Sequence, residues 1–304
     1  MKDSKLKRIL VTAYEVIYEK RRLLRLRAGY SLRIMRPEAT IKYIEKHRCC
    51  IARYGDGEFD HILNLKDEGF QVRSPELTKA LADVLGSKNE NLLLCVPRCM
   101  NTIEGCNNHS GTFWIEWGKN GHHEQIISMI RSYAGKNYLF GDAQITRPYI
   151  DWVTDERARR TFPMLKRLWA DKDIIIVEGE QTRMGVGNDL FDDAKSVKRI
   201  LAPAVGAFER CDEIRHAILD HYHGELIIMA LGPTATILAA DFARMNIQAL
   251  DIGNIDIEYE WFLRGAKTRI AIPGKFTNEA KDGRVYSSCT DQKYLDEVIA
   301  RVGC

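Results

Sequence analysis

Short apolar runs alternate with segments of helical periodicity from Pro37 onwards. Several runs are apolar at almost every position, which is typical of strands buried on both faces, as in a parallel sheet. These runs predict strands at 49–54, 91–96, 137–140, 173–179, 197–203, 225–231 and 247–253. The segments between them predict helices at 76–86, 122–134, 155–170, 208–222 and 234–245.

This alternation of strands and helices predicts an α/β architecture. We expect a Rossmann-like layered fold, with a mainly parallel central sheet flanked by helices and joined by right-handed crossovers. Residues 37–304 contain no Pro/Gly/Ser-rich linker and no internal repeat, so they are expected to form one domain. Residues 1–36 are expected to form a separate, basic helical extension.

Glycines, acids, Asn, Thr and Arg follow most of the predicted strands. The segments after the strands read GDGE, PRCMN, GDAQITRPY, GEQTRMGVGNDLF, PAVGAF, GPTAT and GNIDIEYEW. In open parallel sheets, ligands bind beyond the carboxyl ends of the strands. Turn formation accounts for the glycines, but it does not readily account for an acid or Arg after so many strands. We therefore expect a functional site at this edge of the sheet.

The first of these segments carries two acids around one glycine. In an extended or tight-turn backbone, Asp56 and Glu58 point the same way and can converge on one cation. Carboxylate oxygens suit Mg²⁺ or Mn²⁺, which keep waters and bridge to substrate phosphates. Gly55 and Gly57 would let a bulky anion approach the backbone closely. An ordinary surface turn tolerates the same string, so the motif alone leaves both readings open.

Two later turns have the composition of anion-binding sites. In each, glycines expose backbone N–H groups after a strand, and a polar residue is positioned to cap a following helix. Neither turn has the Gly-Lys-Ser/Thr sequence of a P-loop or the G-x-G-x-x-G sequence of a dinucleotide site, and an ordinary capped turn is the alternative for both. The candidate residues are Arg183, Gly185, Gly187, Asn188, Gly232 and Thr234.

Four acids follow the last predicted strand: Asp251, Asp256, Glu258 and Glu260. Acids this close together repel one another unless some of them face solvent, a metal or a cationic partner. One of them is a candidate general base for an incoming hydroxyl group. The alternative is an acidic helix start, which the helix dipole favours.

Composition points to a reduced, cytoplasmic protein. The 304 residues include eight Cys, but the sequence has no C-x-x-C pair and lacks the dense cysteine spacing of a small secreted domain. The first residues are charged and no apolar signal-peptide core follows them. No apolar stretch approaches the 18 residues that a membrane-spanning helix needs.

The positive charge is concentrated at the N-terminus. Residues 1–36 carry a net charge of +8, whereas the whole chain carries +3. This arm is interpreted either as a solvated helix that packs on the body or on another subunit of a homo-oligomer, or as an attachment to the inner, anionic membrane surface. Nucleic-acid binding is not expected, because the body is acidic and has no recognisable nucleic-acid motif.

Several motifs, taken together and in order, resemble the GT-D-type glycosyltransferases over about residues 37–280. They read IARYGDGEF, GDAQITRPY, IIIVEGEQTRMGVGNDLFDDAKSVKRILAP, LGPTATILAADFA and DIGNIDIEYEWFL. The resemblance implies transfer of a sugar from a UDP-linked donor to a hydroxyl of a bacterial glycan, glycolipid or glycoprotein. It also implies that Asp56 and Glu58 lie at the metal and diphosphate site. The last motif usually has His at the position of Asn254, so metal binding is weaker here if that His helps to hold the ion.

On this interpretation, the D-x-E acids hold a Mn²⁺ or Mg²⁺ ion that neutralises the diphosphate, and Arg side chains and helix N-termini stabilise the leaving group. Arg53 and Asp142 are assigned to the donor site, and Asp256 or Glu260 to the general base. Two alternatives remain: a metal-dependent phosphohydrolase that acts on a nucleotide sugar, and a non-catalytic module that binds nucleotide sugar.

Overall fold

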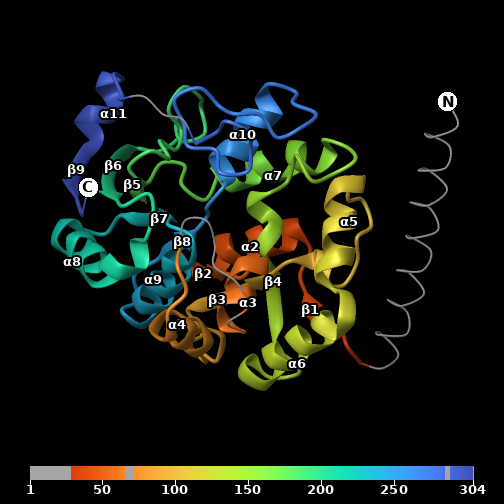
Figure 1. Cartoon of the computed structure of the whole chain (residues 1–304). Helices are drawn as coiled ribbons and strands as arrows, with labels where there is room; N and C mark the ends of the chain where they lie inside the picture. The colour runs from red at the N-terminus through yellow and green to blue at the C-terminus, as the bar shows by residue number, and fades with distance from the viewer. Residues whose placement is uncertain (1–28, 64, 66–70, 285–287, 304) are drawn as a thin grey trace, which may run out of the picture.

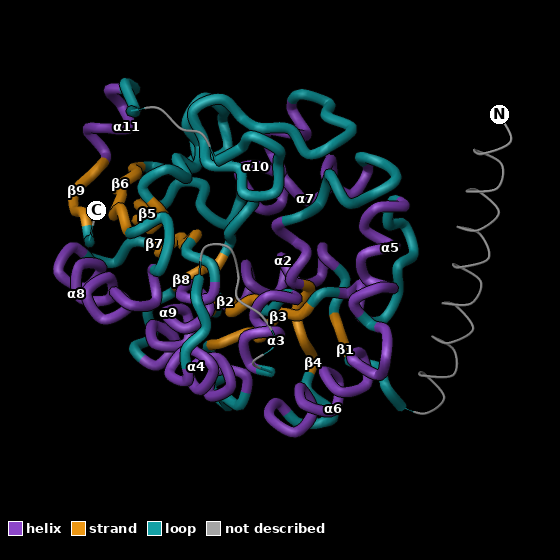
Figure 2. Tube along the Cα trace, viewed as in Figure 1, coloured by secondary structure: helices purple, strands orange, loops and turns teal. Residues whose placement is uncertain are grey.

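The computed structural model describes residues 29–63, 65, 71–284 and 288–303 and contains one parallel sheet (Figures 1 and 2). Its strand order is β1-β4-β3-β2-β8-β7-β5-β6-β9, and every neighbouring pair is parallel. The strands are β1 (Arg33–Ile34), β2 (Cys50–Arg53), β3 (Leu92–Val96), β4 (Leu139–Asp142), β5 (Asp173–Gly179), β6 (Ser196–Ala202), β7 (Leu226–Ala230), β8 (Ala249–Asp251) and β9 (Val298–Arg301).

Helices cover both faces of the sheet. They are α2 (Pro37–His47), α3 (Asp56–Ile62), α4 (Pro75–Leu85), α5 (Asn108–Trp117), α6 (His122–Ala134), α7 (Glu156–Lys166), α8 (Cys211–His221), α9 (Pro233–Arg244), α10 (Ile255–Leu263) and α11 (Gln292–Glu297). Short 3₁₀ helices occur at Arg98–Met100, Lys119–Gly121, Ala143–Thr146 and Ala207–Arg210. Side chains of α3, α4, α6, α8 and α9 belong to one hydrophobic core, and those of α2, α7 and α10 belong to the other.

The two cores explain the nearly continuous apolar runs in the sequence. In β5, Ile175 and Val177 point into the first core, whereas Ile174 and Ile176 point into the second. All four side chains are fully buried. Because successive residues of a strand face opposite sides, a strand covered on both faces needs an apolar residue at each position.

The chain reverses its direction across the sheet between the neighbouring strands β2 and β8. From β2 it continues into α3, where Phe59 packs in the first core, and from β8 into α10, where Trp261 packs in the second. Helices that leave adjacent strands toward opposite faces open a crevice at the carboxyl ends of those strands. The topology therefore places a site next to Asp56 and Asp251.

The structure confirms the predicted fold class, and all seven predicted strands are present with shifts of one or two residues at their ends. The sequence analysis did not predict β1, β9, α2, α3, α5, α10 or α11. β1 pairs with β4, so part of the expected N-terminal extension is a strand of the sheet. Residues 1–28, with most of the basic arm, lie outside the described residues, so its membrane and oligomer roles stay predictions. Among the helices described here, none is long and apolar enough to span a bilayer.

Candidate functional site

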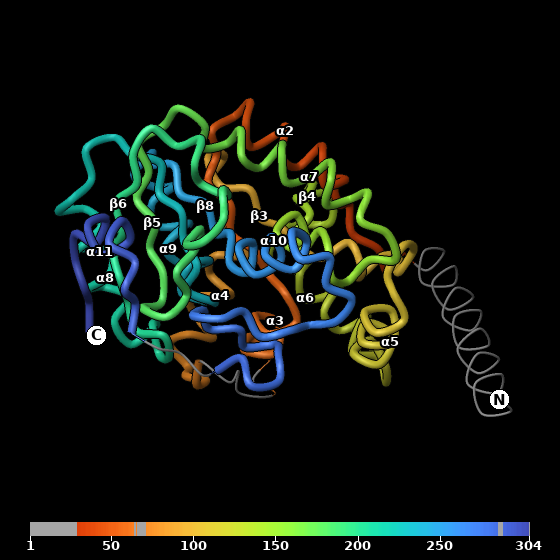
Figure 3. Tube along the Cα trace, turned by 90° about the horizontal axis from the view of Figure 1, so that it is seen from above, coloured from red at the N-terminus to blue at the C-terminus, as the bar shows by residue number. Residues whose placement is uncertain are grey.

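A cavity of about 580 Å³ lies at the carboxyl ends of the strands. It is lined by residues at or directly after the ends of β2 to β8, namely Arg53, Pro97, Ala143, Gly179, Pro203, Ala230 and Asp251. Helix α5 and residues 276–279 also line it. Figure 3 shows the course of the long segment between α10 and α11, which carries residues 276–279. The expectation that a site forms at this edge of the sheet agrees with this geometry.

Arg53 and Asp251 form the base of the cavity. The Arg53 NH2 atom lies 2.8 Å from Asp251 Oδ1, and the Arg53 backbone N–H donates to Oδ2 at 3.1 Å. Arg53 NH1 donates to the Thr146 hydroxyl at 2.7 Å, and the Thr236 hydroxyl donates to the Arg53 carbonyl at 2.8 Å. These bonds join the ends of β2 and β8 to the first turn of α9 and to the segment after β4. Arg53 therefore links several segments of the predicted donor site. Its guanidinium already donates hydrogen bonds to acceptors of the protein itself.

The D-x-E acids lie in the first turn of a helix, and not in the extended or tight-turn backbone that the sequence analysis assumed. Helix α3 begins at Asp56, so Asp56 and Glu58 are about 200° apart around its axis and do not point the same way. Glu58 Oε2 accepts the Gly55 backbone N–H at 2.7 Å, which closes the N-terminal turn. The pKa of Glu58 is raised to about 7, chiefly by burial and also by the nearby Asp251 and Asp56 carboxylates, while the hydrogen bond from the Gly55 N–H lowers it.

The cavity has more acids than cations. Six of its lining residues are Asp or Glu, and three are Arg: Asp56, Glu58, Asp151, Asp251, Asp256, Glu279, Arg53, Arg147 and Arg269. Within the described residues, no three His, Cys, Asp or Glu side chains are grouped as a complete metal site. The surplus of negative charge fits a hydrated Mg²⁺ or Mn²⁺ ion, which completes its coordination with waters and substrate phosphate. Asp56 and Glu58 diverge around α3 and Glu58 Oε2 is already bonded, so they do not form a ready-made two-carboxylate ligand pair.

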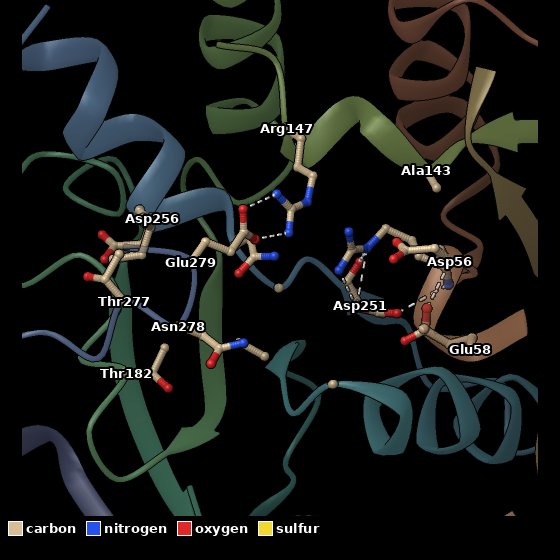
Figure 4. Close-up of a pocket in the computed structure, with 18 of the residues that line it drawn as sticks. Asp56, Glu58, Ala143, Arg147, Thr182, Asp251, Asp256, Thr277, Asn278 and Glu279 are labelled. Carbon is tan, nitrogen blue, oxygen red and sulfur yellow. Dashed lines mark hydrogen bonds and ion pairs between the residues drawn. The ribbon is translucent and has the colours of Figure 1, made fainter. Parts of the chain in front are cut away.

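Four charged side chains in the cavity wall form a chain of ion pairs: Asp151, Arg269, Glu279 and Arg147. Figure 4 shows the Arg147–Glu279 pair. Arg147 donates to both carboxylate oxygens of Glu279, and its NH1 atom does so at 3.0 Å. Arg269 forms an ion pair with the same carboxylate, with Nε 2.9 Å from Glu279 Oε2, and its NH2 donates to Asp151 Oδ1 at 2.6 Å. Burial alone would raise the pKa of Glu279, but Arg147 and Arg269 more than offset this and lower it to about 2. The sequence analysis identified none of these four residues.

Asp256 and Glu260 belong to a buried cluster around Lys275. Lys275 Nζ lies 2.7 Å from Asp256 Oδ2 and 3.2 Å from Glu260 Oε1. Asn188 Nδ2 donates to both carboxylates at 2.8 Å, and the Gly185 N–H donates to Asp256 at 2.8 Å. Asp256 lines the cavity and Glu260 does not. The general-base assignment stays a prediction, and hydrogen bonds that stabilise the ionised carboxylate oppose it.

The loop after β5 contributes Thr182 and Met184 to the cavity wall, and not its predicted anion-binding residues. Arg183 is buried and donates through NH1 to the Gly274 carbonyl at 2.7 Å. No helix follows Asn188, whose Oδ1 accepts the Leu190 N–H at 3.0 Å, so the expected helix cap is corrected to a turn. The donor-binding roles of Arg183, Gly185, Gly187 and Asn188 stay predictions.

Of the remaining residues predicted to bind the donor, some line the cavity and the others are buried behind the residues that line it. Gly232 is the N-cap of α9 and lines the cavity, as do Gly55 and Gly57. Thr234 does not cap α9, because its Oγ1 is buried without a hydrogen-bond partner within the part of the chain that the structure describes. Asp142 is fully buried behind the wall, where Arg157 NH2 lies 3.0 Å from its carboxylate.

Asn254 is the residue at which the resemblance stated above leads us to expect His. It lines the cavity and adopts a left-handed backbone conformation, with φ of 69°, immediately before α10. Asn tolerates this conformation better than most residues because its short amide forms local hydrogen bonds. The left-handed backbone at position 254 therefore favours Asn over most other residues.

Comparison with known proteins agrees with this architecture. The family described as "Glycosyltransferase GT-D fold" matches residues 51–280. "Glycosyltransferase GlyD" of Streptococcus pneumoniae serotype 4 and "Probable glycosyl transferase Gly" of Streptococcus gordonii are each 34% identical to this chain over 266 residues, or 87% of it. The chain spans 32% and 38% of their respective lengths.

Two solved structures have the same fold at 32% identity. One, described as a highly conserved domain of unknown function 1792 with a distinct glycosyltransferase fold, superposes with a TM-score of 0.84 over 93% of this chain and 100% of that one. The other, described as a new glycosyltransferase from Streptococcus sanguinis, gives 0.82 over 90% of this chain and 100% of that one. With the family match and the cavity at the strand ends, these similarities show that the chain belongs to the GT-D glycosyltransferases.

Proposed function

We propose that this chain transfers a sugar from a UDP-linked donor to a hydroxyl group of a bacterial glycan, glycolipid or glycoprotein. The observation that supports this most is the convergence of β2 to β8 on one cavity in a chain of the GT-D family. The cavity volume, about 580 Å³, lies within the usual range for small-molecule sites. The diphosphate is expected at the D-x-E end, where Gly55, Gly57 and Gly232 keep the wall free of side chains.

Asp56 and Glu58 are the residues that would hold a divalent cation. When bound, such an ion neutralises the negative charge that develops on a leaving diphosphate. The protein's own contribution is to position the carboxylates: the Gly55 N–H fixes Glu58 Oε2, and the Arg53–Asp251 pair fixes the strand ends beside them. The excess of acids over cations in the wall is the electrostatic reason why a nucleotide diphosphate would need a cation there.

For the acceptor side, we propose that Asp256 borders the acceptor hydroxyl, because its carboxylate lines the cavity. Its carboxylate already accepts hydrogen bonds from Lys275, Asn188 and Gly185. Service as a general base would therefore need a rearrangement of this cluster. If Asp256 instead fixes the segment that carries residues 276–279, no rearrangement of the cluster is needed.

A donor screen tests the proposed function. Release of nucleotide from a panel of UDP-sugars is followed with and without Mn²⁺, against lipid-linked and peptide-linked glycans and with water as the only acceptor. Release that depends on Mn²⁺ and increases with one acceptor supports glycosyl transfer. Rapid release that no acceptor increases favours the phosphohydrolase alternative, and tight UDP binding without turnover favours a binding module.

A further inference from the structure

Glu279 is a carboxylate held inside the cavity by two arginines that line it. Arg147 binds it with both terminal nitrogens, and Arg269 Nε lies 2.9 Å from its Oε2 atom. About a quarter of each of these three side chains is exposed. Figure 4 shows Glu279 and Arg147 pointing toward each other between the D-x-E end and Asp256. The arrangement is a two-arginine site that contains an anion supplied by the chain itself.

The two-arginine site adjoins the D-x-E end of the cavity. Arg147 directly follows Thr146, whose hydroxyl accepts a 2.7 Å bond from Arg53 NH1, and Arg53 ends the strand that leads into Asp56. A planar guanidinium binds a carboxylate and a phosphate with the same bidentate geometry. A diphosphate positioned at Asp56 and Glu58 is therefore within the same part of the cavity as the arginines.

Glu279 is carried on a compact turn between Thr277 and Gly283. The Thr277 N–H donates to the Gly283 carbonyl at 2.7 Å and the Ala280 N–H to the Thr277 carbonyl at 3.1 Å, so residues 277–283 close on themselves. The preceding residues are fixed by Lys275 in its buried cluster and by the Phe276 N–H, which donates to the Gln181 carbonyl at 2.9 Å. Thr277 is also fixed, because its Oγ1 accepts the Ile272 N–H at 3.3 Å, so a withdrawal of Glu279 would have to take place within residues 278–282.

We propose that Arg147 and Arg269 bind the diphosphate of the nucleotide donor, and that Glu279 is a latch which the diphosphate displaces. This proposal rests on the proposed function, since it takes a nucleoside diphosphate as the ligand. Removing an anion from buried arginines is costly when no other anion replaces it. An exchange of carboxylate for phosphate keeps both arginines paired, and the released Glu279 gains solvation, so the exchange is energetically feasible.

The test compares variants of the full chain by titration calorimetry, with UDP and uridine as probes in the presence of Mn²⁺. Glu279→Gln keeps the side-chain shape but removes the competing charge, so it is expected to bind UDP severalfold more tightly than the wild type. Arg147→Ala is expected to bind UDP at least about tenfold more weakly, a difference of 1.4 kcal/mol. Uridine has no phosphate, so its affinity is expected to change in neither variant. Glu38→Gln is the matched control, because the Glu38–Arg160 pair has similar carboxylate exposure and lies outside the cavity.

The outcomes separate the latch from the proposed function. If the wild type binds UDP and Glu279→Gln binds it equally or more weakly, the latch is wrong and the proposed function stands. If Glu279→Gln binds UDP and the wild type does not, the latch and the proposed function are both supported. If neither the wild type nor Glu279→Gln binds UDP, the latch and the proposed function are both overturned. An equal effect of Arg147→Ala on UDP and uridine would also overturn the latch, because it would show a general structural defect.

Discussion

The Arg53 guanidinium lies 2.8 Å from the Asp251 carboxylate, across the boundary between the two strands at which the chain changes direction in the sheet. Both residues end their strands, and the helices that follow them pack on opposite faces. The two helices that follow, α3 and α10, diverge and leave a crevice between them, and the Arg53–Asp251 pair forms the base of that crevice. It also keeps Asp251 next to Glu58, whose pKa it raises.

Asp251→Asn is expected to destabilise the protein by about 3 kcal/mol. The substitution removes one partner of a mostly buried pair and leaves the Arg53 charge without its anion, which is costly. Urea denaturation followed by circular dichroism measures the effect. Asp83→Asn is the control, since Asp83 pairs with Lys79 at the surface and such pairs contribute only about 0.2–1 kcal/mol. Equal losses in the two variants would show that Asp251 does not support the crevice.

Asp56→Asn and Glu58→Gln are each expected to remove most transfer activity while leaving the fold intact. Gln at position 58 can still accept the Gly55 N–H, so the first turn of α3 keeps its cap. The lost property is the negative charge that would hold a cation. Activity at saturating Mn²⁺ and the melting temperature are the two readouts. Near-normal turnover by both variants would exclude the D-x-E acids as the metal site.

Lys275→Met is expected to destabilise the protein by about 3–5 kcal/mol, because it leaves Asp256 and Glu260 as buried carboxylates without their shared cation. Lys195→Met, at the exposed pair with Asp173, is the control and is expected to cost less than about 1 kcal/mol. Both values come from urea denaturation.

Asp256→Asn separates the structural role of Asp256 from the catalytic role. If Asp256 fixes the segment after α10, the variant loses stability and nucleotide affinity together, as Lys275→Met does. If Asp256 is the general base, the variant loses kcat while its melting temperature and its affinity for UDP are retained. The geometry of the Lys275 cluster favours the first result.

Glu258→Gln is expected to change how stability depends on pH. Burial, and then the Asp151 charge, raise the pKa of Glu258 in the folded protein from 4.5 to about 8, although Arg147 partly opposes this. The folded protein therefore binds more protons than the unfolded chain between these values, and stability falls as pH rises through that window. The variant does not titrate there. It is expected to match the wild type near pH 5 and to exceed it near pH 8.5 by at least about 1.4 kcal/mol, the equivalent of one pKa unit.

Urea denaturation at the two pH values checks this prediction. Glu258 Oε2 accepts the Tyr149 and Ile150 N–H groups, each at 3.0 Å, and a Gln carbonyl can accept the same bonds. The comparison therefore isolates the charge. The same stability difference at both pH values would contradict the raised pKa.

The sequence predicted the inner strands well because each is covered on both faces. β5 begins and ends where its apolar run does, and α6 matches its predicted range. β1 has only two residues, so local pattern could not predict it. α10 was considered only as the alternative for the acids after the last strand, as an acidic helix start. α3 was missed because Gly57 weakens the helical signal and because Gly55, at the N-cap, replaces the Ser or Thr that usually marks a capping box, although Glu58 makes the local capping bond.

The sequence predicted where in the fold the candidate site lies, but only some of the residues that form it. Glycines and acids after successive strands identified the edge of the sheet, because parallel strands share one carboxyl end. Lys275 and Glu279 lie in a segment with no helix or strand, and their partners are ten or more residues away. No local pattern could show that Lys275 is buried between two acids or that Glu279 faces Arg147. These pairings depend on how the segment after α10 packs across the cavity.

The most direct test of the central claim is mass spectrometry of an acceptor glycan incubated with wild-type protein, a UDP-sugar and Mn²⁺. We expect the acceptor to gain the mass of one sugar, with release of one equivalent of UDP, and we expect both to stop when the metal is chelated. Consumption of the donor without any change in the acceptor mass, across the whole panel of acceptors, would contradict the account.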